Sequence, residues 1–347
     1  MMLAQDRTLL VTGGAGFIGA NFVHYWIKNH SKDRIVVLDL LTYAGDLRNL
    51  EPVKDNPKFR FVRGDICNQS LVEQLLIEEQ INIIVNFAAE SHVDRSIQSP
   101  DVFFKTNIEG THSLLKAAKK IWLDRGEKKH RFHHVSTDEV YGSLEPNAPA
   151  FTEQHQYRPN SPYAASKAAS DHIVRSYQHT YDLNTTISNC SNNYGPYHFP
   201  EKLIPLCIVN CLKGKPIPVY GDGKQIRDWL FVEDHCRGIE LILENGRVGE
   251  AYNIGGNNEW INIDIIIYIC ELMDQYHPEG APHADLITHV ADRPGHDRRY
   301  AIDASKIISE LGYRPAETFE TGIRKTVEWY LRNKQWWRGV TEGSYQT

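Results

Sequence analysis

The sequence predicts an α/β protein in which a doubly wound parallel sheet is followed by a smaller mixed α/β region. Between residues 8 and 181, short apolar runs that suit buried strands alternate with amphipathic patterns that suit helices. A glycine-rich turn follows the first of these runs, and small or polar residues follow the later ones. Such residues are typical of the point where a parallel strand passes into a loop, so the pattern predicts ligand-binding loops at one edge of the sheet.

Length and charge limit the function classes. At 347 residues the chain can form one large or two modest domains. Its net charge of -6, from 44 acidic and 38 basic residues, argues against a nucleic acid or an anionic membrane as a general partner. No apolar run approaches about 18 residues, and the first strand begins by Thr8, which leaves no room for a signal peptide. We therefore expect a soluble, cytoplasmic protein.

The six cysteines contain no Cys-x-x-Cys pair, and we expect them to be reduced and mostly buried. Cys207 and Cys211 lie one helical turn apart, but no His or carboxylate stands in the same run. His133 and His134 alternate on a predicted strand, so they cannot easily turn to one ion. The sequence thus predicts no metal site.

The first strand, residues 8–12, leads into a turn that contains Gly13, Gly16 and Gly19, and a helical pattern follows. Glycines at such spots let the backbone approach a pyrophosphate, which then rests on the amides of a helix N-terminus. The spacing of these glycines is by itself weak evidence for a dinucleotide site, because a purely structural turn would also explain it.

Asp39 strengthens the interpretation of that turn, because it closes the next strand, residues 34–38. An acid at this place can accept both ribose hydroxyls and repels a 2′-phosphate, so it predicts NAD rather than NADP. The alternative is that Asp39 only caps a turn.

Two further strands are expected at residues 59–62 and 81–87. The first ends near Asp65, which is placed to meet an adenine amino group, although a solvated loop carboxylate is the alternative. The second ends in Ala88 and Ala89, whose small side chains would let a flat ring approach the sheet.

The central stretch runs from Ser136 to Gly142 and follows a predicted strand at residues 131–135. It places the hydroxyl of Thr137 beside the carboxylates of Asp138 and Glu139 at a strand end. Two close carboxylates push each other's pKa values apart, so one can stay ionised while the other stays protonated. The alternative is a solvated acidic loop.

Tyr163 and Lys167 lie four residues apart in a predicted helix that begins near Pro162 and continues to about residue 181. A Lys ammonium beside a phenol favours the phenolate, so we expect Lys167 to lower the pKa of Tyr163. The pair would then act as a base that removes a hydroxyl proton at neutral pH.

The pattern changes after the strand at residues 185–188. We expect a polar loop, one helix, short strands and turns instead of further β-α units, a last strand at 251–254, and two more helices. The predicted division is a dinucleotide-binding domain over residues 1–190, to which a segment near 228–257 returns, and a mainly substrate-binding domain over 191–347.

Taken together, these motifs resemble the extended short-chain dehydrogenase/reductase family over nearly the whole chain. The shared motifs are Thr12-Gly13-Gly14-Ala15-Gly16-Phe17-Ile18-Gly19 and Tyr163-x-x-x-Lys167. The stretch Ser136-Thr137-Asp138-Glu139-Val140-Tyr141-Gly142 is more specific, and it is similar to that of the dTDP-glucose 4,6-dehydratases, as are residues 88–96, 189–196 and 292–297. The resemblance implies a Rossmann domain, NAD as cofactor, and a nucleotide sugar, dTDP-glucose, as substrate.

The resemblance also implies roles. Tyr163 and Lys167 would serve oxidation at C4 of the sugar, Glu139 would remove the C5 proton and Asp138 would protonate the leaving C6 hydroxyl. Thr137 would hydrogen-bond the C4 oxygen. NAD would contact Gly13, Gly16, Phe17, Ile18, Gly19, Asp39, Thr42, Asp65, Ile66, Ala88, Ala89, Thr106, Tyr163, Lys167 and Asn193. The nucleotide sugar would contact Ser91, Thr137, Asn192, Lys202, Leu203, Pro218, Val219, Tyr220, Arg227, Asn262, Asp292, Arg293, Pro294, Gly295 and His296.

Four alternatives stay open at this point. Another nucleotide-sugar 4,6-dehydratase, a 4-epimerase or a decarboxylase would share the fold, although an epimerase needs no acid at C6. A protein that only senses NAD is a different class, against which the intact Tyr163 and Lys167 argue. The resemblance also implies a homodimer through the helices near residues 99–122 and 161–181.

Overall fold

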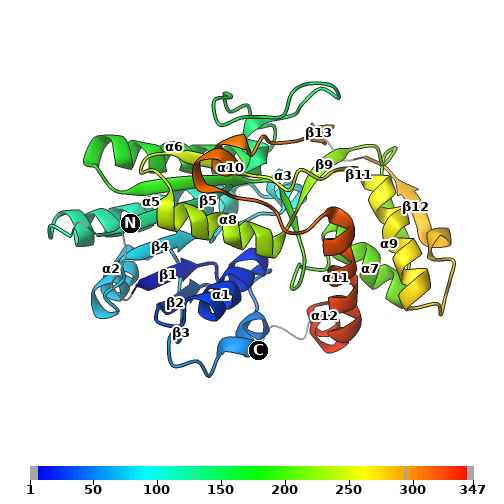
Figure 1. Cartoon of the computed structure of the whole chain (residues 1–347), viewed down its shortest axis with the longest axis horizontal. Helices are drawn as coiled ribbons and strands as arrows, with labels where there is room; N and C mark the ends of the chain where they lie inside the picture. Colours follow the sequence, from blue (N-terminus) through cyan, green and yellow to red (C-terminus); the bar gives the residue numbers. More distant parts are fainter. Residues whose placement is uncertain (1–6, 128, 293–294, 342–347) are drawn as a thin grey trace.

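The computed structural model describes residues 7–127, 129–292 and 295–341. Its centre is a seven-stranded sheet in the order β10-β6-β5-β4-β1-β2-β3, with helices on both faces (Figure 1). Every neighbouring pair in this sheet is parallel. The chain starts in the middle at β1, moves outwards to β3, and crosses back to β4. The predicted doubly wound sheet is therefore confirmed, and its strand order reverses between β1 and β4.

The strands of this sheet lie close to their expected positions. All seven expected strands appear, with ends that differ by a few residues at most. The bounds are β1 Thr8–Thr12, β2 Arg34–Asp39, β3 Phe59–Arg63, β4 Ile83–Asn86, β5 Arg131–Thr137, β6 Thr185–Cys190 and β10 Ala251–Ile254.

Both faces of the sheet are buried, which is why its strands are apolar along their whole length. Leu9 and Val11 point to the face covered by α1 (Phe17–Asn29) and α8 (Val232–Asn245). Leu10 points to the opposite face. That face is covered by α2 (Gln69–Glu78), α5 (Thr111–Ala118) and α6 (Pro162–Tyr181).

Helix α6 begins as the sequence predicts. Pro162 occupies its first turn, and the side chain of Ser161 accepts a hydrogen bond of 3.1 Å from the backbone N–H of Ala164. The long helix expected over residues 99–122 is instead interrupted by wider turns. It consists of α4 (Asp101–Phe103), η2 (Phe104–Gly110), α5 and η3 (Lys119–Leu123), of which η2 and η3 are π-helical.

The second region packs around α7 (Leu203–Lys213), α9 (Asn262–Tyr276) and α11 (Phe319–Arg332). The helix α11 was not predicted, and neither were α8 and α12 (Lys334–Thr341). The remaining elements are η1 Leu47–Val53, α3 Val93–Gln98, η4 Asp138–Tyr141, β7 Asn192–Tyr194, β8 Ile217–Tyr220, β9 Ile226–Phe231, β11 Glu259–Ile261, η5 His283–Leu286, β12 Ile287–Val290, β13 Arg299–Tyr300 and α10 Ser305–Leu311.

Strands β7, β11 and β13 pair with β9, and β8 pairs with β12, so the short strands of the second region form two small sheets. Strand β10 joins the large sheet beside β6. The division of the chain into two domains at residue 190 stays a prediction. In the part of the chain that the structure describes, no helix is both long enough and apolar enough to span a membrane.

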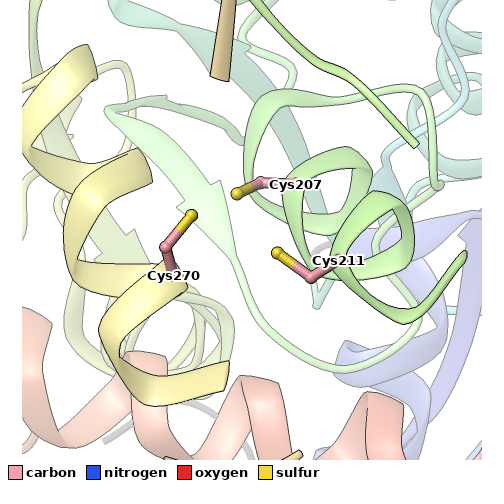
Figure 2. A group of neighbouring side chains, drawn as sticks. All are labelled: Cys207, Cys211 and Cys270. Carbon is pink, nitrogen blue, oxygen red and sulfur yellow. The ribbon is translucent and has the colours of Figure 1, made fainter. Parts of the chain in front are cut away.

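Three cysteines meet between α7 and α9. Figure 2 shows the sulfur atoms of Cys207, Cys211 and Cys270 pointing toward one another, and they lie within 4.8 Å of one another. All three side chains are buried among the apolar residues of this core. Sequence analysis did not connect Cys270 to the other two, because it lies on a different helix. The prediction that no metal binds here stays a prediction.

Candidate active site

A cavity of about 560 Å³ lies along the carboxyl edge of β1, β2, β4, β5 and β6, and residues of the second region close its other side. In parallel sheets this edge, beside the strand-order reversal, is where ligands bind. The cavity brings together most of the predicted residues, although they are spread from Gly13 to His296.

The glycine turn forms one end of the cavity. Gly13 has a φ of +67°, and a Cβ atom on it would lie 2.6 Å from the backbone nitrogen of Ala88. A Cβ atom on Gly19 would lie 2.3 Å from the carbonyl oxygen of Gly13. Only glycine fits at these two positions. The N-terminus of α1 lies next to them and opens onto the cavity. This cradle fits the pyrophosphate of a dinucleotide.

Asp39 at the end of β2 has two functions that sequence analysis treated as alternatives. Its carboxylate accepts hydrogen bonds from the backbone N–H groups of Ala15 at 2.9 Å and Leu41 at 2.8 Å, so it does hold the turn. It also lines the cavity. Burial raises the pKa of Asp39, and the two backbone hydrogen bonds act in the opposite direction.

The central stretch forms the floor of the cavity. Strand β5 extends two residues further than predicted, to Thr137, and η4 follows at once. The Thr137 hydroxyl accepts a hydrogen bond of 3.3 Å from the backbone N–H of Glu139 and so caps η4. This cap directs Thr137, Asp138 and Glu139 into the same space, since all three line the cavity.

Asp138 is the more deeply buried of the two acids, with 2 % of its surface exposed. Among the described residues, its Oδ2 has no hydrogen-bond partner, while Oδ1 accepts a bond of 3.4 Å from the Thr137 hydroxyl. Burial, and then the negative charges of Glu139 and Asp228, raise the pKa of Asp138 well above its usual range. Asp138 therefore holds its proton to a higher pH than a solvated aspartate does.

Tyr163 lies above this stretch, buried on α6 and at the cavity wall. The expectation that its pKa is lowered is wrong for the protein alone. Burial, followed by the charge of Glu139, raises the pKa of Tyr163 well above its ordinary value, although a hydrogen bond with Thr137 acts in the opposite direction. The prediction took account of the charge of Lys167, which favours the phenolate. It did not include the cost of burying the phenolate, and that cost raises the pKa.

Lys167 lies one turn along α6 from Tyr163. Its Nζ donates a hydrogen bond of 2.8 Å to the backbone carbonyl of Val135. Burial lowers the pKa of Lys167 to about 8, and the charge of Asp171 opposes this shift. The ammonium thus keeps most of its charge at neutral pH and lies close to the end of β5.

The other end of the cavity holds the cations and the polar groups predicted for a substrate. The Arg227 guanidinium lies 4.3 Å from the centre of the Tyr300 ring and donates a hydrogen bond of 2.9 Å to the carbonyl of Asp297. In the described part of the chain, the buried side-chain oxygens of Asn192 and Asn262 have no hydrogen-bond partner. Lys202 also lines this end. A ligand with phosphate oxygens and donor groups would match this set.

Five predicted substrate residues either do not line the cavity or lie outside the described residues. Val219 points away from the cavity into the apolar core, because it alternates on β8 with Pro218 and Tyr220. Asp292 and Gly295 do not line the cavity either. The Asp292 carboxylate lies 2.6 Å from Nδ1 of His296. The predicted residues Arg293 and Pro294 lie outside the described residues.

Other residues that line the cavity were not predicted from the sequence. His198 lies against Phe17, with 4.3 Å between the ring centres, and Tyr43 lies under the guanidinium of Arg95. Glu90, Glu201 and Tyr300 line the cavity as well. Apart from Tyr300, which lies on the two-residue strand β13, they come from loops with no regular period, so their spacing in the sequence gives no signal.

Several known proteins are similar to this chain over almost its whole length. A family model described as GDP-mannose 4,6 dehydratase matches residues 10–326. A dTDP-glucose 4,6-dehydratase from Xanthomonas campestris pv. campestris (strain B100) is 57% identical over 98% of this chain and 97% of its own. The enzyme of the same name from Neisseria meningitidis serogroup B (strain ATCC BAA-335 / MC58) is 55% identical, over 98% of each chain.

Solved structures agree with these relatives. DesIV, a dTDP-glucose 4,6-dehydratase from Streptomyces venezuelae solved with NAD and TYD bound, has a TM-score of 0.89 and 46% identity, covering 96% of this chain and 99% of that one. A UDP-glucose 4-epimerase from Thermotoga maritima, solved with UDP-glucose, has a TM-score of 0.83 but only 27% identity, covering 94% and 99%.

Proposed function

The chain belongs to the dTDP-glucose 4,6-dehydratases, and from that premise we propose that its cavity binds NAD and dTDP-glucose and removes water from the sugar across C5 and C6. The observation that carries the proposal is the pair Asp138 and Glu139. Burial favours the protonated form of Asp138, and both acids line the same cavity as Tyr163. An elimination needs an acid and a base at adjacent carbons, which is what this pair supplies.

The glycine cradle, Asp39 and the small residues Ala88 and Ala89 would hold NAD, since all of them line the same end of the cavity. When bound, NAD supplies a reversible hydride acceptor, so that C4 can be a ketone while water is lost and C6 can be reduced afterwards. A C4 ketone is needed because it makes the C5 proton acidic.

The protein's own side chains would move the protons. Tyr163 takes the C4 hydroxyl proton, while Thr137 donates a hydrogen bond to the C4 oxygen. Lys167 supplies the positive charge beside them. Glu139 takes the C5 proton, and Asp138 gives its proton to the departing C6 oxygen. The raised pKa of Tyr163 in the protein alone means that this tyrosine needs further positive charge before it can act as a base.

Two further expectations belong to the proposal. A homodimer would form through α4, η2, α5, η3 and α6, and support comes from exposed apolar side chains there, namely Val102, Phe104 and Tyr181. We also propose a cytoplasmic location, which rests on the sequence argument alone.

The test is incubation of the purified protein with NAD and a panel of dTDP-, UDP-, CDP- and GDP-glucose, followed by mass spectrometry. We expect a product that has lost one water, formed fastest from dTDP-glucose. The competing 4-epimerase function would give a product of unchanged mass. That outcome, or equal rates with all four nucleotides, would contradict the proposal.

A further inference from the structure

Asp171 lies behind the catalytic stretch and does not line the cavity. It follows Lys167 by one turn of α6 and has 2 % of its surface exposed. Three donors converge on its Oδ2: the hydroxyl of Ser136 at 2.9 Å, the hydroxyl of Tyr157 at 3.0 Å and the side-chain amide of Asn189 at 3.3 Å. These donors come from β5, from the loop before α6 and from β6, so one carboxylate ties three segments together.

The other oxygen, Oδ1, faces His134 and lies 3.4 Å from its Nε2. The protonation of this ring follows from its neighbours. The Thr12 hydroxyl accepts from the backbone N–H of Ala88 and donates to Oδ1 of Asn86 at 2.6 Å, so Nδ2 of Asn86 must donate to Nδ1 of His134 at 3.1 Å. The proton of the neutral ring therefore sits on Nε2.

This tautomer matters for Lys167, whose Nζ lies 3.3 Å from the same Nε2. An N–H cannot accept a hydrogen bond from the ammonium, and burial keeps His134 neutral by lowering its pKa to about 4. The neutral His134 ring therefore supplies no negative charge that could keep Lys167 protonated. The ionisable groups that act on the charge of Lys167 from α6 and β6 are Asp171 and the thiol of Cys190. Burial keeps that thiol neutral by raising its pKa to about 12. Asp171 and Lys167 both lie next to Nε2 of His134, so Asp171 supplies the negative charge that acts on Lys167.

We propose that Asp171 is a positioning residue for the dehydratase: its charge keeps the buried Lys167 protonated, and its bond to Ser136 fixes the end of β5, next to Thr137. The catalytic part of this inference rests on the proposed function. The link between Asp171 and the charge of Lys167 does not depend on the substrate, so it can be measured without any.

The first experiment uses the protein without substrate. Lysine labelled with ¹³C at Cε reports the protonation of Lys167 by NMR, with Lys167→Met identifying its signal. In the unmodified protein we expect the transition near the pKa of about 8. In Asp171→Asn it should move down by about one pH unit or more, because burial is no longer opposed. An unmoved transition would overturn the proposal.

The second experiment measures kcat and KM for dTDP-glucose against pH. In Asp171→Asn, the loss of kcat should be smaller at about pH 6 than at about pH 8, since Lys167 recovers its proton in acid, while KM changes less than about twofold. Asp234→Asn is the matched control, because Asp234 is equally buried and binds Arg237 and the backbone N–H groups of residues 316 and 317 outside the cavity. A loss that is equal at both pH values would overturn the charge role.

Ser136→Ala separates the two halves of the proposal, because it removes the hydrogen bond to Asp171 and keeps both charges. It should lower kcat equally at all pH values and leave the Lys167 transition in place. An unchanged kcat would contradict the positioning of β5.

A last comparison covers the case in which Asp171→Asn folds poorly. Adding Lys167→Met removes the uncompensated charge, so the double variant should melt at a higher temperature, or express better, than Asp171→Asn alone. A double variant that is less stable than both single variants would show that the two residues are not a charge pair. Failure of the dTDP-glucose assay in the unmodified protein would instead contradict only the proposed function.

Discussion

The ammonium group of Lys167 donates a hydrogen bond of 2.8 Å to the backbone carbonyl of Val135, and this bond joins α6 to the end of β5. It connects the two stretches that sequence analysis considered separately. Because Tyr163 lies one turn before Lys167, the same contact places the phenol beside Thr137, to which it is hydrogen-bonded. This main-chain contact thus helps to fix the position of the proposed base for oxidation relative to the proposed acids for elimination.

Tyr163→Phe should abolish both oxidation and water loss. It removes the group that takes the C4 hydroxyl proton, so both rates should fall by about 10² to 10⁴, the usual contribution of one general base. Rapid-mixing absorbance at the NADH band, recorded beside product formation, measures the two together. Normal NADH formation in this variant would contradict the assigned role.

Glu139→Gln should separate the two half-reactions. The amide keeps the shape of Glu139 but cannot take the C5 proton, so some enzyme-bound NADH should still form while almost no product appears. Incorporation of solvent deuterium at C5 should be strongly reduced. If the variant loses bound NADH as completely as Tyr163→Phe does, Glu139 is not the base of the elimination.

Asp138→Asn should change the pH dependence of stability. The pKa of Asp138 is raised in the folded protein, so the folded state holds its proton more tightly than the unfolded chain does. The stability from this group is present below the unfolded pKa of about 3.9 and is lost as pH rises through the folded pKa. Asn carries no such proton. The melting temperature of the variant, minus that of the unmodified protein, should therefore increase with pH, whereas a constant difference would contradict the raised pKa.

Gly13→Ala should prevent NAD binding. The new Cβ would lie 2.6 Å from the nitrogen of Ala88, and the φ of +67° is unfavourable for alanine. Gly312→Ala is the matched control, because Gly312 has a φ of +72° and no atom within 4 Å of a Cβ. Both variants should lose stability from the backbone, but calorimetric titration should show NAD binding lost only in Gly13→Ala. Normal affinity in that variant would contradict the cradle.

Phe104→Glu should dissociate the proposed homodimer. Phe104 lies on η2 with 40 % of its surface exposed, and a charge there would be buried without a partner in the interface. Light scattering at micromolar concentration should give twice the chain mass for the unmodified protein and a lower mass for the variant. Ile267→Glu is the control, because Ile267 is also 40 % exposed but lies on α9. A monomer mass for the unmodified protein would contradict the dimer.

Much of the fold follows from local patterns in the sequence. The glycine turn, Asp39, the stretch from Ser136 to Gly142 and the pair Tyr163 and Lys167 were found by spacing, and the parallel sheet brings all of them to one edge. This works because the carboxyl ends of parallel strands must meet, whatever the side chains between them are. Helices α8, α11 and α12 were missed, because the sequence analysis followed strand ends and found no motif there.

What only the tertiary structure decided is the state of the charges and the meeting of distant segments. The sequence placed Lys167 beside Tyr163 and predicted a lowered pKa, whereas burial makes the pKa of Tyr163 rise. It could not show that Val219 faces the core, or that Asp171 and Lys167 both lie next to the ring of His134. Spacing along the chain gives the neighbours of a residue on its own helix or strand. Desolvation and cross-strand contacts depend on all the elements packed around it, and these are known only once the chain has folded.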